Sequence, residues 1–354
     1  MNNNQSGHRG VILMNLGSVE STDVQAVKKY LDEFLMDAKV IDYPYLFRLL
    51  LVKGIITPKR SPRTAEAYKK IWWQEGSPLT VITRRLQKLL QDRLEEPVEI
   101  MMRYGDPHPA TAFRSLMERD PLLREVIVVP LYPHYAMSSY ETAVEYAQHS
   151  YEKGKYPFKL SVIKPFYQEP DYIHALAENI RPSLKQDFDY VLFSYHGVPE
   201  RHIHKSDITH HHCLRSENCC FTESPAHSFC YRHQVITTMN LTAKELGLTE
   251  GKYGISFQSR LGRAEWIRPY TADVLRELPE KGIKKLVVVS PAFVADCLET
   301  LEEIGMEGKD IFMNAGGESF QMVPALNTNS GWVDVLMKWV KEYASGEKEM
   351  ADSV

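Results

Sequence analysis

Short apolar runs rich in β-branched residues alternate with helical patterns along almost the whole chain. The first half contains four runs that predict buried strands: GVILMNLG (10–17), PVEIMMRYG (97–105), EVIVVPLYP (125–133) and KLSVIKPF (159–166). The second half contains four more: YVLFSYHG (190–197), YGISFQS (253–259), KKLVVVSPAF (284–293) and ESFQMVPALN (318–327). Continuous apolar character suits parallel strands that helices cover on both faces. The sequence therefore predicts an α/β protein with parallel sheets.

Two sets of four strands predict an internal duplication into two similar Rossmann-like halves. Each half would be a parallel four-stranded sheet flanked by helices, such as those expected over 81–93 and 235–246. A chain of 354 residues is long enough for two such domains. We place the halves at 1–170 and 171–354. Because ligands of such sheets bind beyond the carboxyl ends of the strands, we expect the active site in a cleft between the halves.

Charge and motif content exclude several classes of function. The 42 Lys and Arg residues against 46 Asp and Glu give a formal net charge of −4, so no basic footprint indicates nucleic acid. No Walker loop or GxGxxG motif follows a predicted strand, so a nucleotide is not the expected ligand. The start MNNNQSGHRG is polar and no apolar run is long enough to span a bilayer. We therefore expect a cytoplasmic protein.

The most apolar long stretch is YLFRLLLVKGII (45–56), which Arg48 and Lys53 interrupt. It could lie on a membrane surface as a peripheral contact. A half-buried helix followed by a loop fits the same pattern.

His196 ends a predicted strand in the segment SYHGVP. The following Gly-Val-Pro breaks the strand and would leave the imidazole facing a cleft. A neutral imidazole in that position could accept a proton from a bound ligand. On the residues alone, a satisfied core histidine is an equally good interpretation.

Three carboxylates follow the seventh predicted strand, at Asp296, Glu299 and Glu303. Their spacing of i, i+3 and i+7 predicts one acidic face on the first turns of an α-helix, with Leu298 and Leu301 on the other side. Such a row could attract a divalent cation and relay protons. The alternative is a solvated acidic first turn, which the helix dipole favours.

Several longer blocks, in order, resemble the ferrochelatase family. In the second half they are SYHGVP, FQSRLGRAEWIRPYT and PAFVADCLETLEEIG; in the first half they are ILMNLGS, FLMDAKVID, KRSPRTAEAYKKIW, EGSPL and MRYGDP. The resemblance runs from about residue 10 to 343 with one insertion. It implies a chelatase that inserts Fe²⁺ into protoporphyrin IX to give protohaem, the last step of haem biosynthesis.

The resemblance also implies roles for the polar residues. His196 would be the active-site histidine and Glu299 its acidic partner across the porphyrin, both at the site of the substrate iron. Glu303 and Asp296 would continue an acidic path away from the macrocycle. Many relatives carry histidine where Cys297 stands, and a bacterial subset carries cysteine, so no mechanism should depend on an imidazole at this position.

The porphyrin site follows from the same resemblance. Arg60 and Ser77 match positions that contact the propionates, and Arg is well suited to hold a carboxylate. Leu16, Tyr68 and Trp266 match positions that line the macrocycle. Without the family, a solvated charge and ordinary core packing would explain Arg60 and Trp266. The segment 45–58 falls where the family has a lip over the cleft mouth.

An insertion at about 205–232 holds four of the five cysteines, spaced C-x5-C-C-x9-C: Cys213, Cys219, Cys220 and Cys230. Four thiolates in one short loop suit a [2Fe–2S] cluster or a structural Zn²⁺. Nearby histidines leave a mixed Cys/His zinc site open: His210, His211, His212, His227 and His233. The loop is similar to that of a bacterial ferrochelatase subgroup that binds [2Fe–2S], which favours the cluster.

Three alternatives remain open on the sequence. A chelatase of the same architecture could use cobalt or another tetrapyrrole, such as coproporphyrin or sirohydrochlorin. A non-catalytic iron–sulfur or tetrapyrrole sensor would not need both His196 and Glu299. A periplasmic-type binding protein shares the two-lobed shape but would need a signal peptide. The oligomeric state cannot be derived from the sequence.

Overall fold

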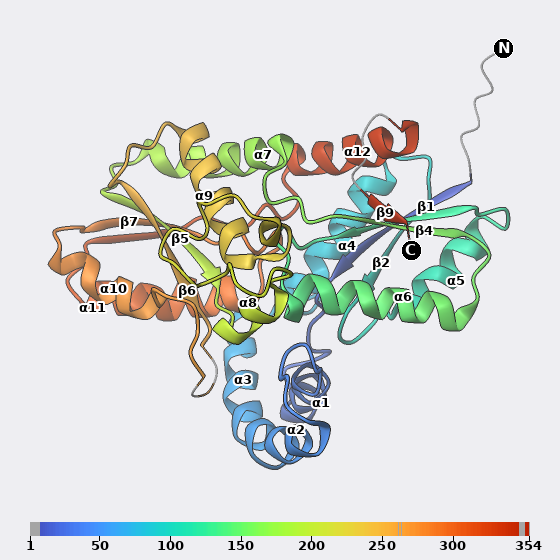
Figure 1. The fold of residues 1–354 in the computed structure, drawn as a ribbon, viewed down its shortest axis with the longest axis horizontal. Coiled ribbons are helices and arrows are strands. Elements are labelled where there is room, and N and C mark those ends of the chain that lie inside the picture. Colours follow the sequence, from blue (N-terminus) through green and yellow to red (C-terminus); the bar gives the residue numbers. More distant parts are fainter. Residues whose placement is uncertain (1–7, 261, 263, 347–350, 354) are drawn as a thin grey trace. The chain divides into compact units, whose positions relative to one another are not determined.

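The computed structural model describes residues 8–260, 262, 264–346 and 351–353. These residues form two compact units (Figure 1). The first unit takes the described residues of 1–131, 137–165 and 330–354, and the second takes 132–136 and 166–329. The chain crosses between the units at 131–132, 136–137, 165–166 and 329–330. The C-terminal helix, however, belongs to the first unit.

The sheet of the first unit has the strand order β2-β1-β3-β4-β9. Its strands are β1 (Arg9–Asn15), β2 (Val98–Met102), β3 (Glu125–Pro130), β4 (Lys159–Ile163) and β9 (Ala351–Ser353). The first four are parallel, with Val11 opposite both Val98 and Ile127. The short β9 adds to β4 in the antiparallel sense.

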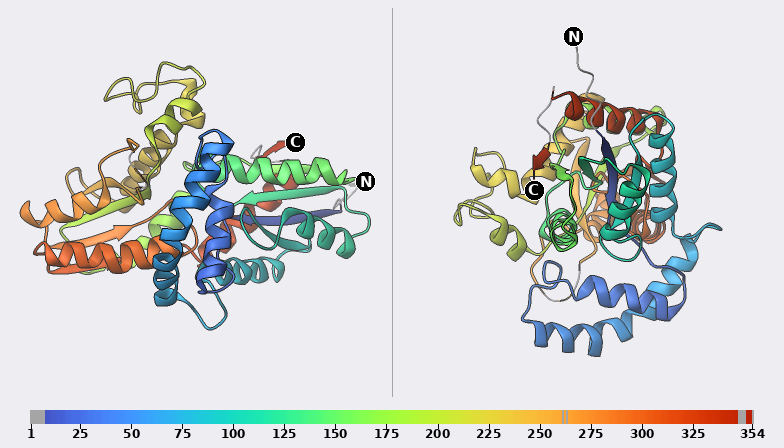
Figure 2. Two further views of the ribbon diagram at one scale, coloured as in Figure 1. Left: turned by 90° about the horizontal axis from the view of Figure 1, so that it is seen from below. Right: turned by 90° about the vertical axis from the view of Figure 1, so that its right-hand side faces the viewer.

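The helices of the first unit flank this sheet or extend from it. They are α1 (Val24–Leu35), α2 (Tyr45–Leu51), the π-helix η1 (Val52–Ile56), α3 (Thr57–Ile71), α4 (Pro78–Gln91), α5 (Pro109–Arg119), the π-helix η2 (Met137–Glu141), α6 (Thr142–Gly154) and α12 (Ser330–Ser345). Helices α1 and α3 run side by side, and α2 with η1 joins their far ends (Figure 2).

The second unit repeats the plan with the strand order β6-β5-β7-β8, all parallel. Its strands are β5 (Tyr190–His196), β6 (Tyr253–Gln258), β7 (Lys285–Val289) and β8 (Ser319–Met322). Its helices are α7 (Pro170–Ile180), the 3₁₀ helix η3 (Arg181–Lys185), α8 (Glu200–Ser206), the 3₁₀ helix η4 (Pro225–Phe229), α9 (Tyr231–Leu246), α10 (Thr271–Glu280), the π-helix η5 (Glu299–Gly308) and α11 (Lys309–Asn314).

Both sheets thus place their first strand between their second and third strands. This confirms the predicted α/β class with two similar halves, and all eight predicted strands are present. The continuous apolar runs form these strands because both strand faces are covered: residues 11–14 of β1 and 191–195 of β5 are buried throughout. In such an order the chain leaves neighbouring strands in opposite directions, which opens a ligand site at their carboxyl ends.

Candidate active site

His196 is the last residue of β5, at the point in the second unit where the strand order reverses. Strand β7 lies on one side of β5 and β6 on the other, with His196 opposite Gln258. The segment that carries Glu299 follows β7 directly. The topology therefore directs the predicted histidine and the predicted carboxylates to adjacent strand ends.

The His196 ring is partly buried and has a defined tautomer. Its Nδ1 lies 2.7 Å from the carbonyl oxygen of Gly197, which only accepts hydrogen bonds, so Nδ1 is the donor. In the neutral ring Nε2 is then the basic nitrogen. Two aromatic rings flank the imidazole: Trp266 at 6.5 Å and Phe293 at 6.4 Å between ring centroids. A base and two aromatic surfaces therefore share one neighbourhood.

Gly197 allows these groups to approach one another. A Cβ at this position would lie 2.9 Å from the backbone oxygen of Gln258 and 3.1 Å from Cε3 of Trp266. The Gly197 amide also donates to that same Gln258 oxygen, at 2.8 Å. Trp266 is buried and held by a bridge to Pro199. Any side chain at residue 197 would push the histidine strand away from the tryptophan.

Glu299 and Glu303 lie on η5, a ten-residue π-helix, and not on the predicted α-helix. The expectation of one α-helical face for all three carboxylates is therefore wrong, since Asp296 precedes the helix and the helical repeat is wider. Long π-helical segments are rare and often occur at functional sites. Both glutamates are partly buried.

Asp296 is buried and its carboxylate holds the turn that leads into η5. The Oδ1 atom accepts from the Thr300 hydroxyl at 2.9 Å and from the Ala325 amide at 3.2 Å. The Oδ2 atom accepts from the Asn327 side chain at 2.6 Å. This carboxylate is thus hydrogen-bonded within the protein, whereas sequence reasoning placed it on a cleft-facing row.

Glu303 is connected to the end of β6. Its Oε2 accepts a hydrogen bond from the hydroxyl of Ser259, the residue after Gln258. Ser259 has a backbone φ of +67°, a conformation that costs a non-glycine residue energy and is enriched at functional sites. Because Gln258 pairs with His196, this contact attaches Glu303 to the strand next to the histidine.

Cys297 is buried beside Glu299. Burial, together with the charge of Glu299 and a hydrogen bond to it, raises the pKa of the Cys297 thiol well above its usual range. The thiol therefore stays protonated and donates to the Glu299 carboxylate.

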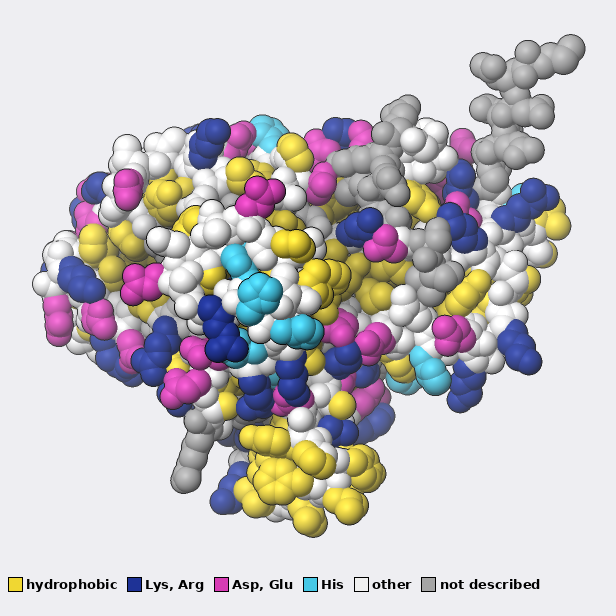
Figure 3. Space-filling view, in the orientation of Figure 1, with side chains coloured by type: hydrophobic (Ala, Val, Ile, Leu, Met, Phe, Trp, Pro, Cys, Tyr) yellow, Lys and Arg dark blue, Asp and Glu magenta, His cyan; other side chains and the backbone are white. Residues whose placement is uncertain are grey.

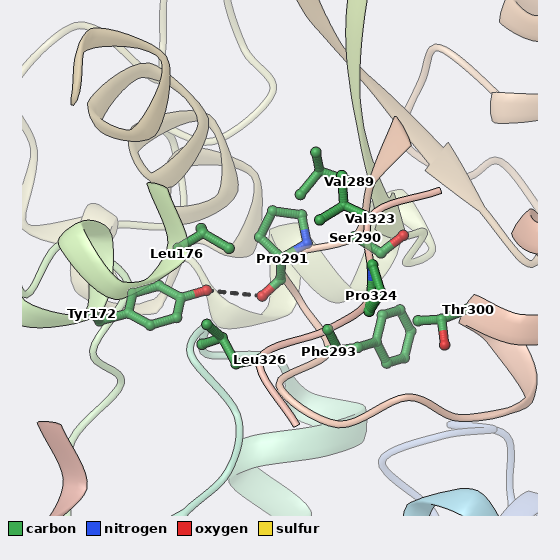
Figure 4. A pocket seen from close by; sticks show the side chains of 11 residues that line it. Tyr172, Leu176, Val289, Ser290, Pro291, Phe293, Thr300, Val323, Pro324 and Leu326 are labelled. Atoms are coloured by element: carbon green, nitrogen blue, oxygen red, sulfur yellow. Dashed lines mark hydrogen bonds between the residues drawn. The ribbon is translucent and has the colours of Figure 1, made fainter. Parts of the chain in front are cut away.

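A small pocket lies next to this region within the second unit (Figure 4). Phe293 and Thr300 line it together with Tyr172, whose hydroxyl donates to the carbonyl oxygen of Pro291 at 2.9 Å. The lining is mainly apolar, and one of its residues, Phe293, also contacts the His196 ring.

Three of the residues expected to bind porphyrin gather in the first unit around Ser18. The Ser18 hydroxyl donates to Tyr68 at 3.2 Å and accepts from Ser77 at 2.6 Å. Leu16, two residues earlier, is partly buried beyond the end of β1. Arg60 is exposed on α3, two turns before Tyr68. The fifth residue, Trp266, lies in the second unit.

The segment 45–58 exposes its apolar side chains and buries its arginine. Leu46, Leu50 and Phe47 on α2 are 72%, 71% and 55% exposed. The buried Arg48 guanidinium instead donates to the carbonyl oxygens of residues 41 and 43, at 3.1 and 2.9 Å. Figure 3 shows the resulting apolar patch at the tip of this part of the unit. Among the described residues, no helix is long and apolar enough to cross a membrane.

The four cysteines of the insertion are all buried and reduced, and they contact one another in a chain. The sulfurs of Cys219 and Cys220 are 4.0 Å apart. Contact with Cys230 and burial raise the pKa of Cys220, and contact with Cys213 raises the pKa of Cys230 to about 12. In the part of the chain that the structure describes, no three His, Cys, Asp or Glu side chains are arranged to hold a metal ion.

Imidazoles of the same loop fix the backbone of the cysteine pair. His212 and His227 donate from Nε2 to the carbonyl oxygen of Cys219, at 2.7 and 3.0 Å. His233 donates from Nδ1 to the carbonyl oxygen of Cys220 at 2.7 Å and stacks on His227 with ring centroids 3.6 Å apart. Each of these three histidines therefore fixes the backbone of the loop through one ring nitrogen.

Comparison with known proteins decides the family. The ferrochelatase family model matches residues 8–344. The chain belongs to the ferrochelatase family. Members are metal chelatases, enzymes that insert ferrous iron into a porphyrin in haem synthesis. Ferrochelatases from Ectopseudomonas mendocina and Pseudomonas fluorescens are each 47% identical over 328 residues, covering 92% of this chain and 95% of theirs. The ferrochelatase from Opitutus terrae is 44% identical, covering 95% of this chain and 98% of its own.

Solved structures of chelatases share the fold at low identity. SirB from Bacillus subtilis with Fe³⁺ matches with a TM-score of 0.55 and 12% identity, covering 96% of this chain and 97% of SirB. The sirohydrochlorin chelatase SirB from Bacillus subtilis subspecies spizizenii in complex with cobalt gives a TM-score of 0.54 at 11% identity, covering 98% and 99%. These similarities extend the α/β architecture of ferrochelatases to other metal chelatases.

Sequence reasoning missed three residues that contact the predicted site. Ser18 links Tyr68 to Ser77, Ser259 holds Glu303, and the hydroxyl of Tyr231 donates to the backbone oxygen of His196. Ser18 and Ser259 each lie just beyond the end of a strand, and a polar residue at that position could have been predicted from the sequence as part of the site. Tyr231 follows Cys230 in the insertion, and nothing in the local pattern connects it with His196.

Proposed function

We propose that this ferrochelatase inserts Fe²⁺ into protoporphyrin IX with His196 as the base for the pyrrole protons. The main support for this proposal is the tautomer of His196. Its Nδ1 donates to the Gly197 carbonyl, which leaves Nε2 to accept a proton beside Trp266 and Phe293. Insertion releases two protons as the metal forms bonds to four pyrrole nitrogens. One is taken by Nε2 of His196 and the other by a carboxylate.

Glu299 is the proposed carboxylate, and with His196 it holds the incoming ferrous ion before insertion. Because Nε2 has a single lone pair, it accepts the pyrrole proton only after the ion has passed to the porphyrin. The hydrogen bond from the Cys297 thiol orients this carboxylate without needing an imidazole at position 297. Glu303, attached to Ser259, would carry protons onward. Asp296 completes the acidic set chiefly by fixing the turn before Glu299, because its own oxygens are already occupied by hydrogen bonds.

The porphyrin is held by apolar and aromatic surfaces and by few polar groups in this proposal. Leu16, Tyr68 and Trp266 line the macrocycle, since flat rings favour stacking and apolar contact. Ser77 and the exposed Arg60 take the propionates, where a guanidinium can clasp a carboxylate with two hydrogen bonds.

The test is anaerobic insertion of Fe²⁺ into protoporphyrin, followed by the change in porphyrin absorbance. His196→Ala should lower turnover by about 10²-fold or more, the usual contribution of a positioned base. The matched control is His174→Ala, an exposed histidine on α7 of the same unit. Full turnover in His196→Ala would refute the assignment of the base. If the wild type turns over coproporphyrin or cobalt but not protoporphyrin with iron, the proposed substrates are wrong and the alternative tetrapyrrole or metal is the substrate.

We further propose that Cys213, Cys219, Cys220 and Cys230 bind a [2Fe–2S] cluster, with structural Zn²⁺ as the alternative. The proposal is supported by donor chemistry: four buried cysteines of one loop, whose thiols contact one another in a chain, are the type of ligand that either group takes. A bound cluster would supply one-electron redox chemistry. The protein contributes the burial, the fixed backbone of the cysteine pair and the Arg232 guanidinium, which lies 3.2 Å from the Cys220 sulfur and 3.8 Å from the Cys219 sulfur.

Anaerobic purification with iron, sulfide and zinc analysis separates these cofactors. Iron and acid-labile sulfide in equal amounts, with visible absorbance that Cys219→Ala abolishes, would support the cluster. Ser216→Ala, an exposed position on the same loop, should keep the colour. One zinc per chain without visible absorbance would assign zinc instead.

The apolar patch of α2 is the proposed site of peripheral membrane contact at the cytoplasmic face. Its exposed leucines and phenylalanine surround an inward-facing Arg48, and contiguous exposed apolar surface of this kind marks an interaction site. Burying one such side chain gains about 1.5–3 kcal/mol when complete. Three side chains that are more than half exposed would together supply about 3–5 kcal/mol.

The triple variant Leu46→Ser, Phe47→Ser, Leu50→Ser should therefore weaken binding to anionic vesicles by about 10²-fold or more. The control is Leu122→Ser, a singly exposed leucine elsewhere in the same unit. Equal co-sedimentation of the triple variant and the wild type would rule out membrane contact through this patch.

A further inference from the structure

Three consecutive residues at the start of α9 contact two different places. Cys230 caps the helix and contacts the thiols of Cys213 and Cys220. Tyr231 points its hydroxyl at the His196 backbone, and Arg232 points its guanidinium at the cysteine sulfurs. A single helical turn therefore touches both the candidate cysteine site and the candidate catalytic histidine.

The Tyr231 contact fixes the main chain that carries the imidazole. Its hydroxyl donates to the carbonyl oxygen of His196 at 2.8 Å, and its ring is buried against His134. Burial raises the pKa of Tyr231, so the hydroxyl remains a donor. The next peptide is fixed as well, because the Gly197 amide donates to Gln258. The His196 carbonyl has its partner outside the sheet, on the insertion side.

The other end of the turn is attached to the cysteine pair. Arg232 Nη1 lies 3.2 Å from the sulfur of Cys220, whose backbone oxygen accepts from His233. A change in the charge or spacing of the sulfurs acts directly on Cys230 and Arg232. Because Tyr231 lies between them on one rigid turn, it cannot keep its position if both neighbours move.

We propose that Tyr231 is a positioning residue for His196, and that through it the first turn of α9 makes the placement of the imidazole depend on the state of the four-cysteine site. This inference rests on the proposed roles of His196 and the cysteines. Tyr231 touches neither porphyrin nor iron in it. The tyrosine acts only through the His196 carbonyl.

The first test compares Tyr231→Phe with the wild type by hydrogen exchange of residues 194–198 and by steady-state kinetics. Loss of one hydrogen bond of about 1 kcal/mol should speed exchange there by about fivefold and lower kcat by a similar factor, while KM for protoporphyrin stays within twofold. Tyr151→Phe is the control, since its hydroxyl also donates to a backbone oxygen, that of Phe158, but in the other unit. Unchanged exchange and kcat in Tyr231→Phe would overturn the positioning role.

The second test measures the same exchange in protein whose cysteine site is loaded and in protein stripped by a chelator. Exchange at 194–198 should rise on stripping in the wild type and not in Tyr231→Phe. If stripping unfolds the loop, Arg232→Gln serves as a milder perturbation, because it keeps all four thiols. Its exchange at 194–198 should resemble that of partly stripped protein. Equal exchange in loaded and stripped wild type would overturn the coupling. Absence of any bound metal in the purified protein would refute the proposed cofactor, while Tyr231→Phe still tests the positioning role.

Discussion

Replacement of Gly197 by alanine tests whether the close approach at the end of β5 holds His196, the proposed base, in place. The added Cβ would lie 2.9 Å from the Gln258 carbonyl oxygen and 3.1 Å from Trp266 Cε3, with Phe257 Cβ at 3.6 Å. The nearest obstacle is backbone of a paired strand, so it cannot rotate away as a flexible side chain would. Overpacking of this kind costs about 1–3 kcal/mol.

The strand pairing increases that cost. Moving β5 away from β6 lengthens the Gly197–Gln258 hydrogen bond of 2.8 Å, which contributes about 1 kcal/mol. We therefore expect Gly197→Ala to lower the free energy of unfolding by about 2–3 kcal/mol. A displacement near 1 Å of a catalytic group costs about 10²-fold in rate, so kcat should fall by at least tenfold.

Urea unfolding, followed by circular dichroism, and iron insertion under saturating porphyrin provide the assay. The control is Gly54→Ala on η1, where an added Cβ meets nothing within 4 Å, so stability should hold or rise slightly. Gly197→Ala protein that unfolds at the wild-type urea concentration and keeps its kcat would refute the reasoning.

Three further predictions concern the surroundings of the site. Ser259→Ala removes the hydrogen bond to Glu303, and turnover at saturating substrate should fall about threefold to thirtyfold; an unchanged rate would exclude Glu303 from proton transfer. Burial opposes ionisation of Asp207, but hydrogen bonds from the Thr209 hydroxyl and the amides of residues 213 and 212 outweigh it and lower the pKa of this carboxyl. The ionised Asp207 therefore stabilises the folded cysteine loop above pH ~4, and this stabilisation is lost below it. Protease cleavage of the loop should therefore increase on acidification, and at neutral pH in Asp207→Asn. Arg232→Gln removes a positive charge beside two sulfurs, so the reduction potential of the proposed cluster should fall. A tenfold change in the redox ratio corresponds to about 59 mV, and Arg232→Lys should recover part of it.

The sequence was sufficient for strands such as β1, β3 and β7 because each is a nearly continuous buried apolar run between turns. The run that predicted β8 (Ser319–Met322) is less apolar, and that strand is not buried. Strand β9 was not predicted, since Ala351–Ser353 is short and polar; it pairs with β4 in the antiparallel sense. The π-helical form of η5 also escaped, because over ten residues the apolar spacing does not distinguish it from an α-helix. Asp296 was misplaced for the same reason, since the one-face argument assumed an α-helical repeat that begins before residue 299.

The duplicated fold places the proposed base, His196, and the proposed apolar contact, Leu16, at equivalent strand ends of the two halves. Leu16-Gly17 follows β1, and His196-Gly197 ends β5; each of these strands lies between the second and third strands of its sheet. In both halves the glycine packs on a carbonyl oxygen at the end of the neighbouring strand: an added Cβ would lie 1.8 Å from that of Tyr104 at Gly17, and 2.9 Å from that of Gln258 at Gly197. The shared glycine brings the preceding residue to the edge of the sheet at the strand end where ligands bind. At this equivalent position the two halves differ in chemistry, with leucine in the first unit and histidine in the second.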